Sequence, residues 1–504
     1  MSLLGVDAGT TGCKAVAFSL DGGTLAASYE EYGFDFPEPG QAVLDSPAVW
    51  ERIKAAIRRT VADCGRDPVT ALAVSSMGEA MVPVTRDRRI LGPSLLNFDV
   101  RGQEYLHDLA HRLTDERLFA VNGNALGNHF GLTKLMWIRD HQPELYRQAD
   151  LFLNWGAFVP FMLGVDPTVD YSLANRSLLF DLDARDWSDE LLSWSGLDQG
   201  KLPPTVASGT QLGTVSPALA RELGLPEKTV IVAGAHDQCA NAVGCGAVPP
   251  GSAMLGMGTH FTIVPVYAHR PQAGVMLAQG LNTEHHALAD RYVCFIYNLS
   301  GAIVKWYRDT FAADEHRRAL ERGEDVYTRL FDEIPAGPSP VTVLPHFGPT
   351  LFPEPVTHPN GAMTGLTLET RRGDILKGIL EGAMYSLKEA VDRLPEAGMA
   401  IREFRAVGGG SKSDAWVQLC ADILNRPFVR PRVTEAGCLG AAILAGAGTG
   451  VFSSVEEGVS AMVALEKGFE PVPANVAAYA GSYERFRRLW PQLKGYLQGQ
   501  LSGG

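Results

Sequence analysis

The feature that most constrains this sequence is a short glycine-rich turn that occurs twice, each time between two apolar segments. The first copy lies in residues 5–14, Gly-Val-Asp-Ala-Gly-Thr-Thr-Gly-Cys-Lys. In a phosphate-binding loop of the Walker type, Gly-Lys is followed by Ser or Thr and opens a helix. Here Lys14 is followed by Ala-Val-Ala-Phe, which is typical of a strand. The sequence therefore predicts an antiparallel hairpin, with strands at residues 3–6 and 13–19 on either side of the turn.

The second copy of the turn lies in residues 254–260, Met-Leu-Gly-Met-Gly-Thr-His, and a predicted strand at 261–266 follows it. A stretch rich in glycine and proline at 244–251 precedes it and is the expected domain boundary. The 504 residues are enough for two to four domains. Because both halves begin with the same device and alternate strands with helices, we predict an α/β protein with domains at 1–247 and 248–504.

The first half continues with local signals for strands and a helix. Asp-Gly-Gly at 21–23 predicts a turn into a third strand at 24–30, and residues 69–75 predict a buried strand. Between them, Ser46 followed by Pro47 predicts an N-cap and the first residue of a helix. Apolar residues at helical spacing predict the buried face of this helix: Val49, Trp50, Ile53, Ile57 and Val61.

Turns of this composition are suited to hold phosphate. Glycine lets the backbone come close and take positive φ, so that successive N–H groups form an anion-binding nest, and threonine hydroxyls add donors. The alternative is that both turns are ordinary tight hairpins, but their recurrence favours phosphate binding. The residues concerned are Gly9, Thr10, Thr11 and Gly12 in the first turn, and Gly256, Gly258 and Thr259 in the second.

An acid, Asp7, stands beside the first turn. A carboxylate does not bind phosphate directly, because like charges repel. Mg²⁺ is commonly bound by one carboxylate, waters and phosphate oxygens. Asp7 therefore predicts a magnesium ion between the protein and the phosphates.

A second acid, Asp237, follows the most strongly predicted strand, at residues 229–233. In open α/β sheets, ligand-binding residues lie beyond the carboxyl ends of the strands, which makes Asp237 a candidate general base. The alternative is that Asp237 caps a helix that starts near Gln238. We expect its neighbour His236 to pack or to support the site and not to bind a ligand.

Late in the chain, Gly-Gly-Gly-Ser at 408–411 lies between a predicted strand at 404–407 and a predicted helix at 414–424. Such a junction allows the close approach of a nucleotide, or serves only helix packing. Residues 427–433 are expected to be extended, and a helix of small residues, suited to very close packing, is expected at 436–450.

The composition excludes several classes of function. The net charge of −13 argues against a nucleic-acid partner and against binding to an anionic membrane. The seven cysteines form no Cys-x-x-Cys pair, which argues against a zinc site or a disulfide framework and favours a reducing cytoplasm. The sequence predicts neither a signal peptide nor a membrane span. We expect a cytoplasmic protein whose partner is a small molecule.

Two glycine-threonine hairpins, an aspartate after a strand between them, and a late Gly-Gly-Gly-Ser together resemble the FGGY carbohydrate kinases. This family belongs to the superfamily of actin-like, sugar-kinase and heat-shock chaperone ATPases. The resemblance extends from Leu3 to about Phe452. It implies two ribonuclease H-like (actin-type) domains around a central cleft, which binds MgATP and a sugar or polyol.

The resemblance also implies roles for residues on the nucleotide side. Asp7 matches the metal-associated acid and Asp237 the catalytic base. The phosphate hairpins match at Gly9, Thr10, Thr11 and Lys14 and at Gly258 and Thr259; Gly301 and Lys305 match contacts on the nucleotide-side helix, and Gly409, Gly410 and Asp414 match the adenosine motif.

On the acceptor side the sequence departs from the family pattern. Ser-Ser-Met-Gly-Glu-Ala at 75–80 stands where glycerol kinases have Arg-Glu and xylulose kinases have Met-His-Gly. Glu79 keeps the glycerol-kinase acid, but Gly78 replaces the arginine, which predicts a vacant volume beside Glu79 and a longer acceptor than glycerol.

Two further segments complete the predicted acceptor site. Asn-Phe-Asp-Val-Arg at 97–101 resembles the Trp-x-Asp-x-Arg of pentulose kinases without the tryptophan, and His129 stands where glycerol kinases have a tyrosine. We therefore predict that Glu79, Asp99, Arg101 and His129 bind the acceptor together with Asp237. An ordinary surface or capping acid is the alternative for Glu79 and Asp99.

These observations predict an ATP-dependent kinase, with Mg²⁺, of a small sugar or polyol, and a ketopentose or C4–C6 polyol is favoured. The alternative acceptors are glycerol and a sugar acid such as gluconate, whose carboxylate would face Arg101. Two other functions are the alternatives. One is an actin- or chaperone-like ATPase, which would need no sugar pocket, and the other is a sugar-binding regulator that has lost catalysis. The oligomeric state stays open, a homodimer included.

Overall fold

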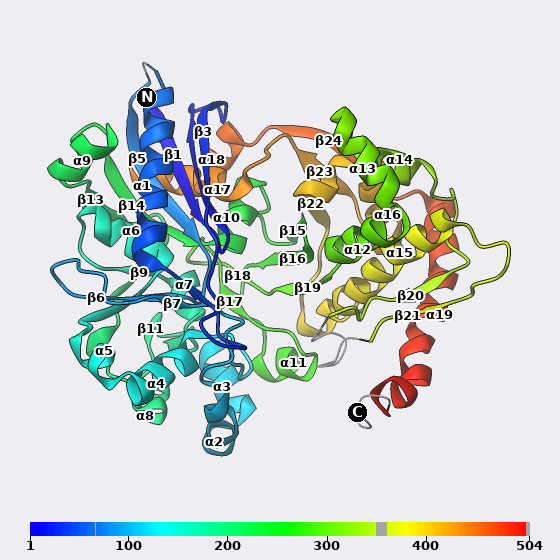
Figure 1. The fold of residues 1–504 in the computed structure, drawn as a ribbon, viewed down its shortest axis with the longest axis horizontal. Coiled ribbons are helices and arrows are strands. Elements are labelled where there is room, and N and C mark those ends of the chain that lie inside the picture. Colours follow the sequence, from blue (N-terminus) through cyan, green and yellow to red (C-terminus); the bar gives the residue numbers. More distant parts are fainter. Residues whose placement is uncertain (66, 349–359, 500–504) are drawn as a thin grey trace.

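The fold consists of two mixed sheets, one in each half of the chain, with helices packed against them (Figure 1). The computed structural model describes residues 1–65, 67–348 and 360–499. The first sheet lies on the left of the view. Its strands, in spatial order, are β3 (Thr24–Glu31), β2 (Gly12–Phe18), β1 (Ser2–Ala8), β5 (Val69–Ser76), β14 (Val230–His236) and β13 (Gln211–Thr214).

The second sheet repeats this order with the same strand directions. In both sheets an antiparallel meander of three strands is followed by two parallel strands and one antiparallel edge strand. A small hairpin of β17 (Glu284–His285) and β18 (Tyr292–Val293) also joins β16. The equivalent strands are β19 (Ile296–Leu299), β16 (His260–Tyr267), β15 (Ser252–Met257), β22 (Glu403–Val407), β23 (Phe428–Pro431) and β24 (Leu465–Phe469).

The predicted α/β architecture of two actin-type domains is therefore confirmed. The strands around both glycine-rich turns, the third strand and the strands before Asp237 and before Gly-Gly-Gly-Ser all form where the sequence predicts them, within a few residues. The helix expected at 414–424 is α16 (Asp414–Leu424). The domain boundary expected near residue 247 stays a prediction. A helix from beyond this point, at residues 436–448, packs against the first sheet.

The first long helix, α1 (Ser46–Asp63), packs on β2 and β3, and its predicted apolar face is buried at Val49, Trp50, Ile53 and Ile57. Its predicted cap is wrong by one residue. Asp45 is the N-cap, because its backbone is extended and its carboxylate accepts a hydrogen bond from the N–H of Ala48.

Two helices of small residues cross between the sheets with unusually close backbones. They are α10 (Asp237–Gly244) and α17 (Ala436–Gly448), which ends two residues earlier than predicted. A Cβ atom on Gly440 would lie 1.9 Å from the carbonyl oxygen of Ala240, and one on Gly244 would lie 1.9 Å from that of Ala436. Although α17 comes late in the sequence, it packs on β1 and β5 of the first sheet (Figure 1).

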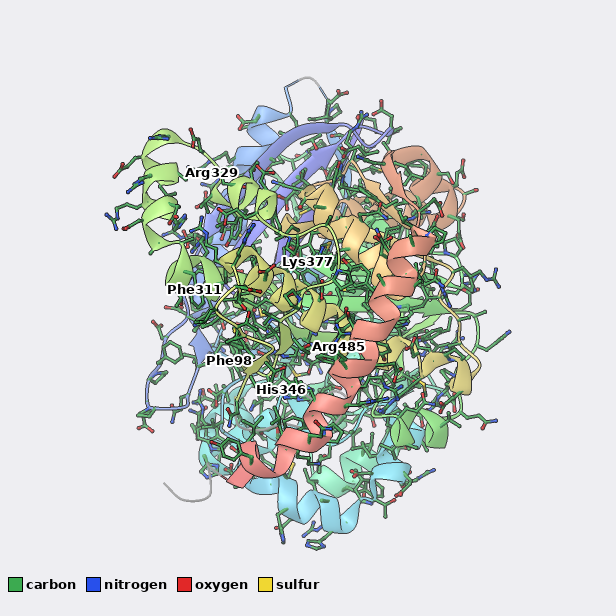
Figure 2. The ribbon with its side chains drawn as sticks, turned by 90° about the vertical axis from the view of Figure 1, so that its right-hand side faces the viewer. Phe98, Phe311, Arg329, His346, Lys377 and Arg485 are labelled. Atoms are coloured by element: carbon green, nitrogen blue, oxygen red, sulfur yellow. The ribbon has the colours of Figure 1, made fainter. Side chains whose placement is uncertain are left out.

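Other helices cover the outer faces. Figure 2, which views the right-hand side of Figure 1, shows the long C-terminal helix α19 (Pro473–Gly499) crossing the outer face of the second half. Across the described residues, no helix combines the length and apolar character needed to span a bilayer. All seven cysteines are free thiols. Further helices are α4 (Gly131–His141) and α7 (Tyr171–Asn175) in the first half and α12 (Gly301–Phe311) and α15 (Arg372–Val391) in the second.

The contact between α10 and α17 generates a stability prediction. We expect Gly440→Ala to lower the free energy of unfolding by about 1–3 kcal/mol, because the added methyl group meets backbone that cannot move aside cheaply. Gly481→Ala is the matched control, since Gly481 also lies in a helix but a Cβ there meets nothing within 4 Å. That control should be neutral or slightly stabilising. Denaturant titration measures both, and equal stability of the two variants would contradict the close contact.

Candidate active site

The first glycine-rich turn is the link between β1 and β2. The N–H of Gly9 donates to the carbonyl of Gly12, and the Tyr32 hydroxyl donates to the carbonyl of Gly9 at 2.7 Å. The expectation of positive φ at these glycines is wrong, because none of the turn glycines in either hairpin adopts it. Gly12 instead gives room, since a Cβ there would lie 2.4 Å from the Tyr29 hydroxyl.

The second turn joins β15 to β16 and lies against the start of α12. The N–H of Ala302 donates to the carbonyl of Thr259 at 3.0 Å. A Cβ on Gly301 would lie 2.1 Å from the carbonyl oxygen of Gly258, so only glycine fits there. Lys305, one turn further on, is exposed and pairs with Asp309. The structure thus brings Gly258, Thr259 and Gly301 together, while Lys305 points to another helical side chain.

The predicted metal-associated acid, Asp7, lies on β1 directly opposite Lys14 on β2. Ser75 donates a hydrogen bond to Asp7 Oδ1 at 2.7 Å. Burial raises the pKa of Asp7, and the Ser75 hydrogen bond and the Lys14 charge oppose that rise. Lys14 Nζ lies 2.6 Å from Oε2 of Glu435, the N-cap residue of α17.

This donor set fits one particular kind of metal site. Among the residues that the structure describes, no group of three or more His, Cys, Asp or Glu side chains is arranged to enclose a metal ion. A single fixed carboxylate beside a phosphate turn suits Mg²⁺, which keeps several waters and takes its other ligands from phosphates. The N-terminus of α17 also reaches Asp7, since a Cβ on Gly437 would lie 3.5 Å from Asp7 Cγ.

The candidate base, Asp237, is the first residue of α10, at the carboxyl end of β14, and His236 occupies the N-cap position. The side chain of Asp237 is 31% exposed, but its Oδ1 atom is buried and finds no hydrogen-bond partner among the residues that the structure describes. Burial and the charges of Asp7 and Glu79 raise the pKa of Asp237 to about 7. Asp237 is therefore subject to the charges of both the acid beside the first glycine-rich turn and the acid of the predicted acceptor site.

His236 supports this arrangement, as expected. Its Nε2 atom lies 3.2 Å from Asp237 Oδ1, and its ring packs edge-on against Phe295. Burial, together with the Arg176 charge, lowers the pKa of His236 to about 3, so the imidazole is neutral at physiological pH.

The vacant volume expected beside Glu79 is filled by an arginine that the sequence analysis missed, Arg176. It donates from Nε to Glu79 Oε1 at 2.9 Å, and its Nη2 bonds the same oxygen. A Cβ on Gly78 would lie 2.7 Å from Arg176 Cγ, so the glycine at 78 makes room for this side chain. The one available signal was a lone charge within Ala-Asn-Arg-Ser-Leu-Leu-Phe, because a cation buried in such a run needs a partner.

The other predicted acceptor residues are divided by the structure. The partly exposed His129 lies against Phe130, and burial together with the Arg176 charge lowers the pKa of His129 to about 4. Asp99 is fully buried and is bound by the Arg101 guanidinium and by the N–H of Ala42. The charges of Arg176 and Glu79 thus act on His129, whereas Asp99 and Arg101 form a closed pair with each other.

The glycine-rich junction after β22 combines a left-handed backbone at one glycine with close packing at another. Gly408 has φ 92°, which favours glycine, and a Cβ on Gly410 would lie 3.1 Å from the Trp416 ring. Gly409 lies in the same short 3₁₀ turn. Asp414, the first residue of α16, pairs with Arg430 and Lys467. The adenosine role of these residues stays a prediction.

Comparison with known proteins identifies similar chains over the whole length. Family models of the FGGY family of carbohydrate kinases match residues 2–244 (N-terminal domain) and 279–449 (C-terminal domain). The xylulose kinase of Bacillus subtilis is 26% identical over 98% of this chain and 97% of its own, and an autoinducer-2 kinase of Escherichia coli is 27% identical over 99% and 96%.

Solved structures show the same fold. The xylulose kinase from Rhodospirillum rubrum superposes with a TM-score of 0.88 at 24% identity, over 99% of this chain and 100% of its own. A gluconate kinase from Lactobacillus acidophilus superposes with a TM-score of 0.86 at 22% identity, over 99% of each chain. At such identities the superpositions establish the architecture and leave the acceptor open.

The closed pair of Asp99 and Arg101 generates a prediction about its role. If the pair is structural, Asp99→Asn weakens a buried charge-assisted bond and lowers the free energy of unfolding by about 1.5–3 kcal/mol. The KM for the acceptor should stay unchanged in that case. A raised acceptor KM with unchanged stability would instead assign Asp99 to acceptor binding. Thermal unfolding and steady-state kinetics on one preparation separate the two outcomes.

Proposed function

The chain belongs to the FGGY family of carbohydrate kinases, and from this premise we propose that it transfers the γ-phosphoryl group of ATP to a hydroxyl of a ketopentose, with Asp237 as the general base. One observation carries the proposal. The Asp237 carboxyl is electrostatically coupled both to Asp7, at the phosphate turn, and to Glu79, at the acceptor cluster. A base for phosphoryl transfer has to stand between these two partners.

The raised pKa of Asp237 suits this task. A general base works best when its pKa lies near the operating pH, and burial with two neighbouring acids brings Asp237 to about 7. Its Oδ1 is buried against His236, so the attacking hydroxyl would approach the part of the carboxyl group that accounts for the 31% exposure of the side chain. Neutral His236, 3.2 Å away, limits the space around this oxygen without adding charge.

The phosphate side is built for positioning and charge stabilisation, which is most of what phosphoryl transfer requires. We assign the β- and γ-phosphates to the two turns, with Gly9, Thr10 and Thr11 on one side and Gly258 and Thr259 on the other. Lys14 would supply positive charge, and Asp7 would hold Mg²⁺. When bound, Mg²⁺ neutralises the charge that develops on the transferred phosphoryl group. Gly409, Gly410 and Asp414 would border the adenosine.

The choice of a ketopentose rests on the acceptor side and on the relatives. Several relatives that cover nearly the whole chain are named xylulose kinase. The cluster of Glu79, Arg176 and His129 offers both donors and acceptors of hydrogen bonds, which suits hydroxyl groups. A polyol of four to six carbons is the next candidate, followed by gluconate and then glycerol.

A substitution at the base tests the mechanism. We expect Asp237→Asn to lower kcat by about 10²–10⁴-fold while the KM for ATP changes little, because an amide does not accept the proton. Asp45→Asn is the matched control, since it changes another aspartate at a helix start and keeps the cap. Near-normal turnover of the Asp237 variant would remove Asp237 from the mechanism.

The pH dependence gives a second check on the same residue. The carboxylate has to be ionised to act as a base, and its pKa in the free protein is about 7. We therefore expect kcat/KM for the acceptor to be low in acid and to rise with pH through about pH 7 to a plateau. A profile that is flat from pH 5.5 to 8.5, a range of about three units around this pKa, would contradict the assignment.

An acceptor screen tests the substrate class. ATP consumption is measured with ketopentoses, C4–C6 polyols, gluconate and glycerol, and the values of kcat/KM are compared. We expect D-xylulose or another ketopentose to lead and glycerol to trail, because a three-carbon acceptor leaves polar groups of the cluster unpaired. ATP hydrolysis that no acceptor stimulates would favour an ATPase, and a lead for gluconate or glycerol would contradict the proposed class.

A further inference from the structure

Arg176 occupies an unusual position between the two halves of the chain. It follows α7 in the first half and is 8% exposed. Its guanidinium lies 4.9 Å from the ring centre of Phe130, in the first half, and 5.7 Å from that of Phe295, in the second. Phe295 in turn contacts His236, the neighbour of Asp237. One aromatic ring, that of Phe295, therefore separates Arg176 from His236, the neighbour of Asp237.

The acids that bind Arg176 also come from both halves. Glu79, after β5, takes the Nε and Nη2 hydrogens, and Glu284, on β17, takes a hydrogen from Nη1. Asn282 donates to the same oxygen of Glu284 at 2.8 Å. Within the described part of the chain, these bonds use three of the five N–H groups of the guanidinium, so two donors remain.

The β17 segment that carries Glu284 is fixed against the first half. The N–H of Thr283 donates to the carbonyl of Gly123, and the N–H of His285 donates to Asn175 Oδ1. Glu284 itself is 1% exposed. Glu79 and Arg176 keep slightly more exposure, at 8% each, and their charges also act on Tyr297 of the second half. Glu284 is thus placed to hold the guanidinium, while Glu79 and Arg176 retain some accessible surface.

Charge and geometry together indicate what this cluster selects. One guanidinium stands between two carboxyl groups, and Asp237 adds a third acid nearby, so a carboxylate on the acceptor meets no unpaired cation there. The free N–H donors of Arg176 and the lone pairs of Glu79 instead match the donor and acceptor of a hydroxyl group. A bidentate guanidinium of fixed geometry discriminates strongly between a hydroxyl that is present and one that is missing.

We propose that Arg176, held between Glu79 and Glu284, is a specificity-determining residue that binds a hydroxyl of an uncharged acceptor, and that Glu284 is its positioning residue from the other half. The proposal rests on the proposed kinase function. The volume predicted to be vacant beside Glu79 is occupied by the Arg176 guanidinium, which another segment of the chain supplies.

The test compares Arg176→Lys with wild type on the uncharged acceptor that leads the screen, D-xylulose in the first instance, and on its 1-, 3- and 4-deoxy analogues. Arg88→Lys is the matched control, because Arg88 also stacks on an aromatic ring, Phe161, and bonds backbone carbonyls away from the cleft. We expect Arg176→Lys to lower kcat/KM for the parent acceptor by about 10–100-fold. For the analogue that lacks the bound hydroxyl, Arg176→Lys and wild type should have nearly the same kcat/KM. The KM for ATP should stay within about threefold of the wild-type value.

Glu284→Gln tests the positioning role. It keeps an oxygen for Arg176 Nη1 but removes a charge, so the acceptor KM should rise more than kcat falls, and the ratio of gluconate to D-xylulose use should increase. If Arg176→Lys fails to fold, the double variant Arg176→Gln with Glu284→Gln removes the cation and one acid together and is compared across the same analogues. Glu381→Gln, another buried glutamate of the second half, on α15, is the control.

The outcomes separate this inference from the function beneath it. An active wild type in which Arg176→Lys loses the same factor on every analogue, or loses nothing, overturns the acceptor role of Arg176 alone. An unchanged ratio of gluconate to D-xylulose use in Glu284→Gln overturns the role of Glu284. A wild type that phosphorylates no compound of the screen overturns the proposed function, and with it this inference.

Discussion

The close crossing of α10 and α17 is the contact on which the rest of the site depends. Asp237 begins α10, and the N-terminus of α17 brings Glu435 to Lys14 and Gly437 to Asp7. Because the two helices touch backbone to backbone, a shift of either one moves Asp237, the proposed base, relative to the first glycine-rich turn. The glycines and alanines of this crossing therefore act on the chemistry through geometry, although none of them carries a functional group.

The two sheets share one topology, but the chain uses them differently. In the first sheet, the strand ends carry the acids Asp7 and Asp237, and Glu79 follows β5. In the second sheet, Gly258 follows β15, Gly408 follows β22, and Arg432 follows β23, the strand equivalent to β14, so none of these strand ends is followed directly by an acid. Acids suit a metal and an acceptor hydroxyl, whereas bare backbone suits the close approach of a nucleotide. The two halves thus share one backbone topology but differ in the side chains at their strand ends, and we propose that this difference separates their roles.

Much of this was predictable because it is local. A turn of glycine and threonine between apolar runs specifies a hairpin from a few neighbouring residues, and an aspartate after a buried strand falls at a sheet edge by topology. Arg176 escaped because its partners, Glu79 and Glu284, are far away in the sequence and meet only in the folded chain. The pairing of Asp99 with Arg101 was hidden for another reason, since spacing shows which residues are near but not which bonds they prefer.

The exchange at residue 78 shows why the acceptor site has to be considered as a set of residues. A glycine there predicts a vacant volume beside Glu79 if the motif is considered alone. In the folded protein, Gly78 is a consequence of Arg176, because any Cβ at 78 would collide with the arginine stem at 2.7 Å and approach His236 at 3.0 Å. Glu79 has a guanidinium partner, which burial requires of a carboxylate. This partner, Arg176, follows α7 and is shared with Glu284. The charge of Glu79 is therefore balanced by a cation from a distant segment, and the acceptor preference that we propose depends on Glu79, Arg176 and Glu284 together.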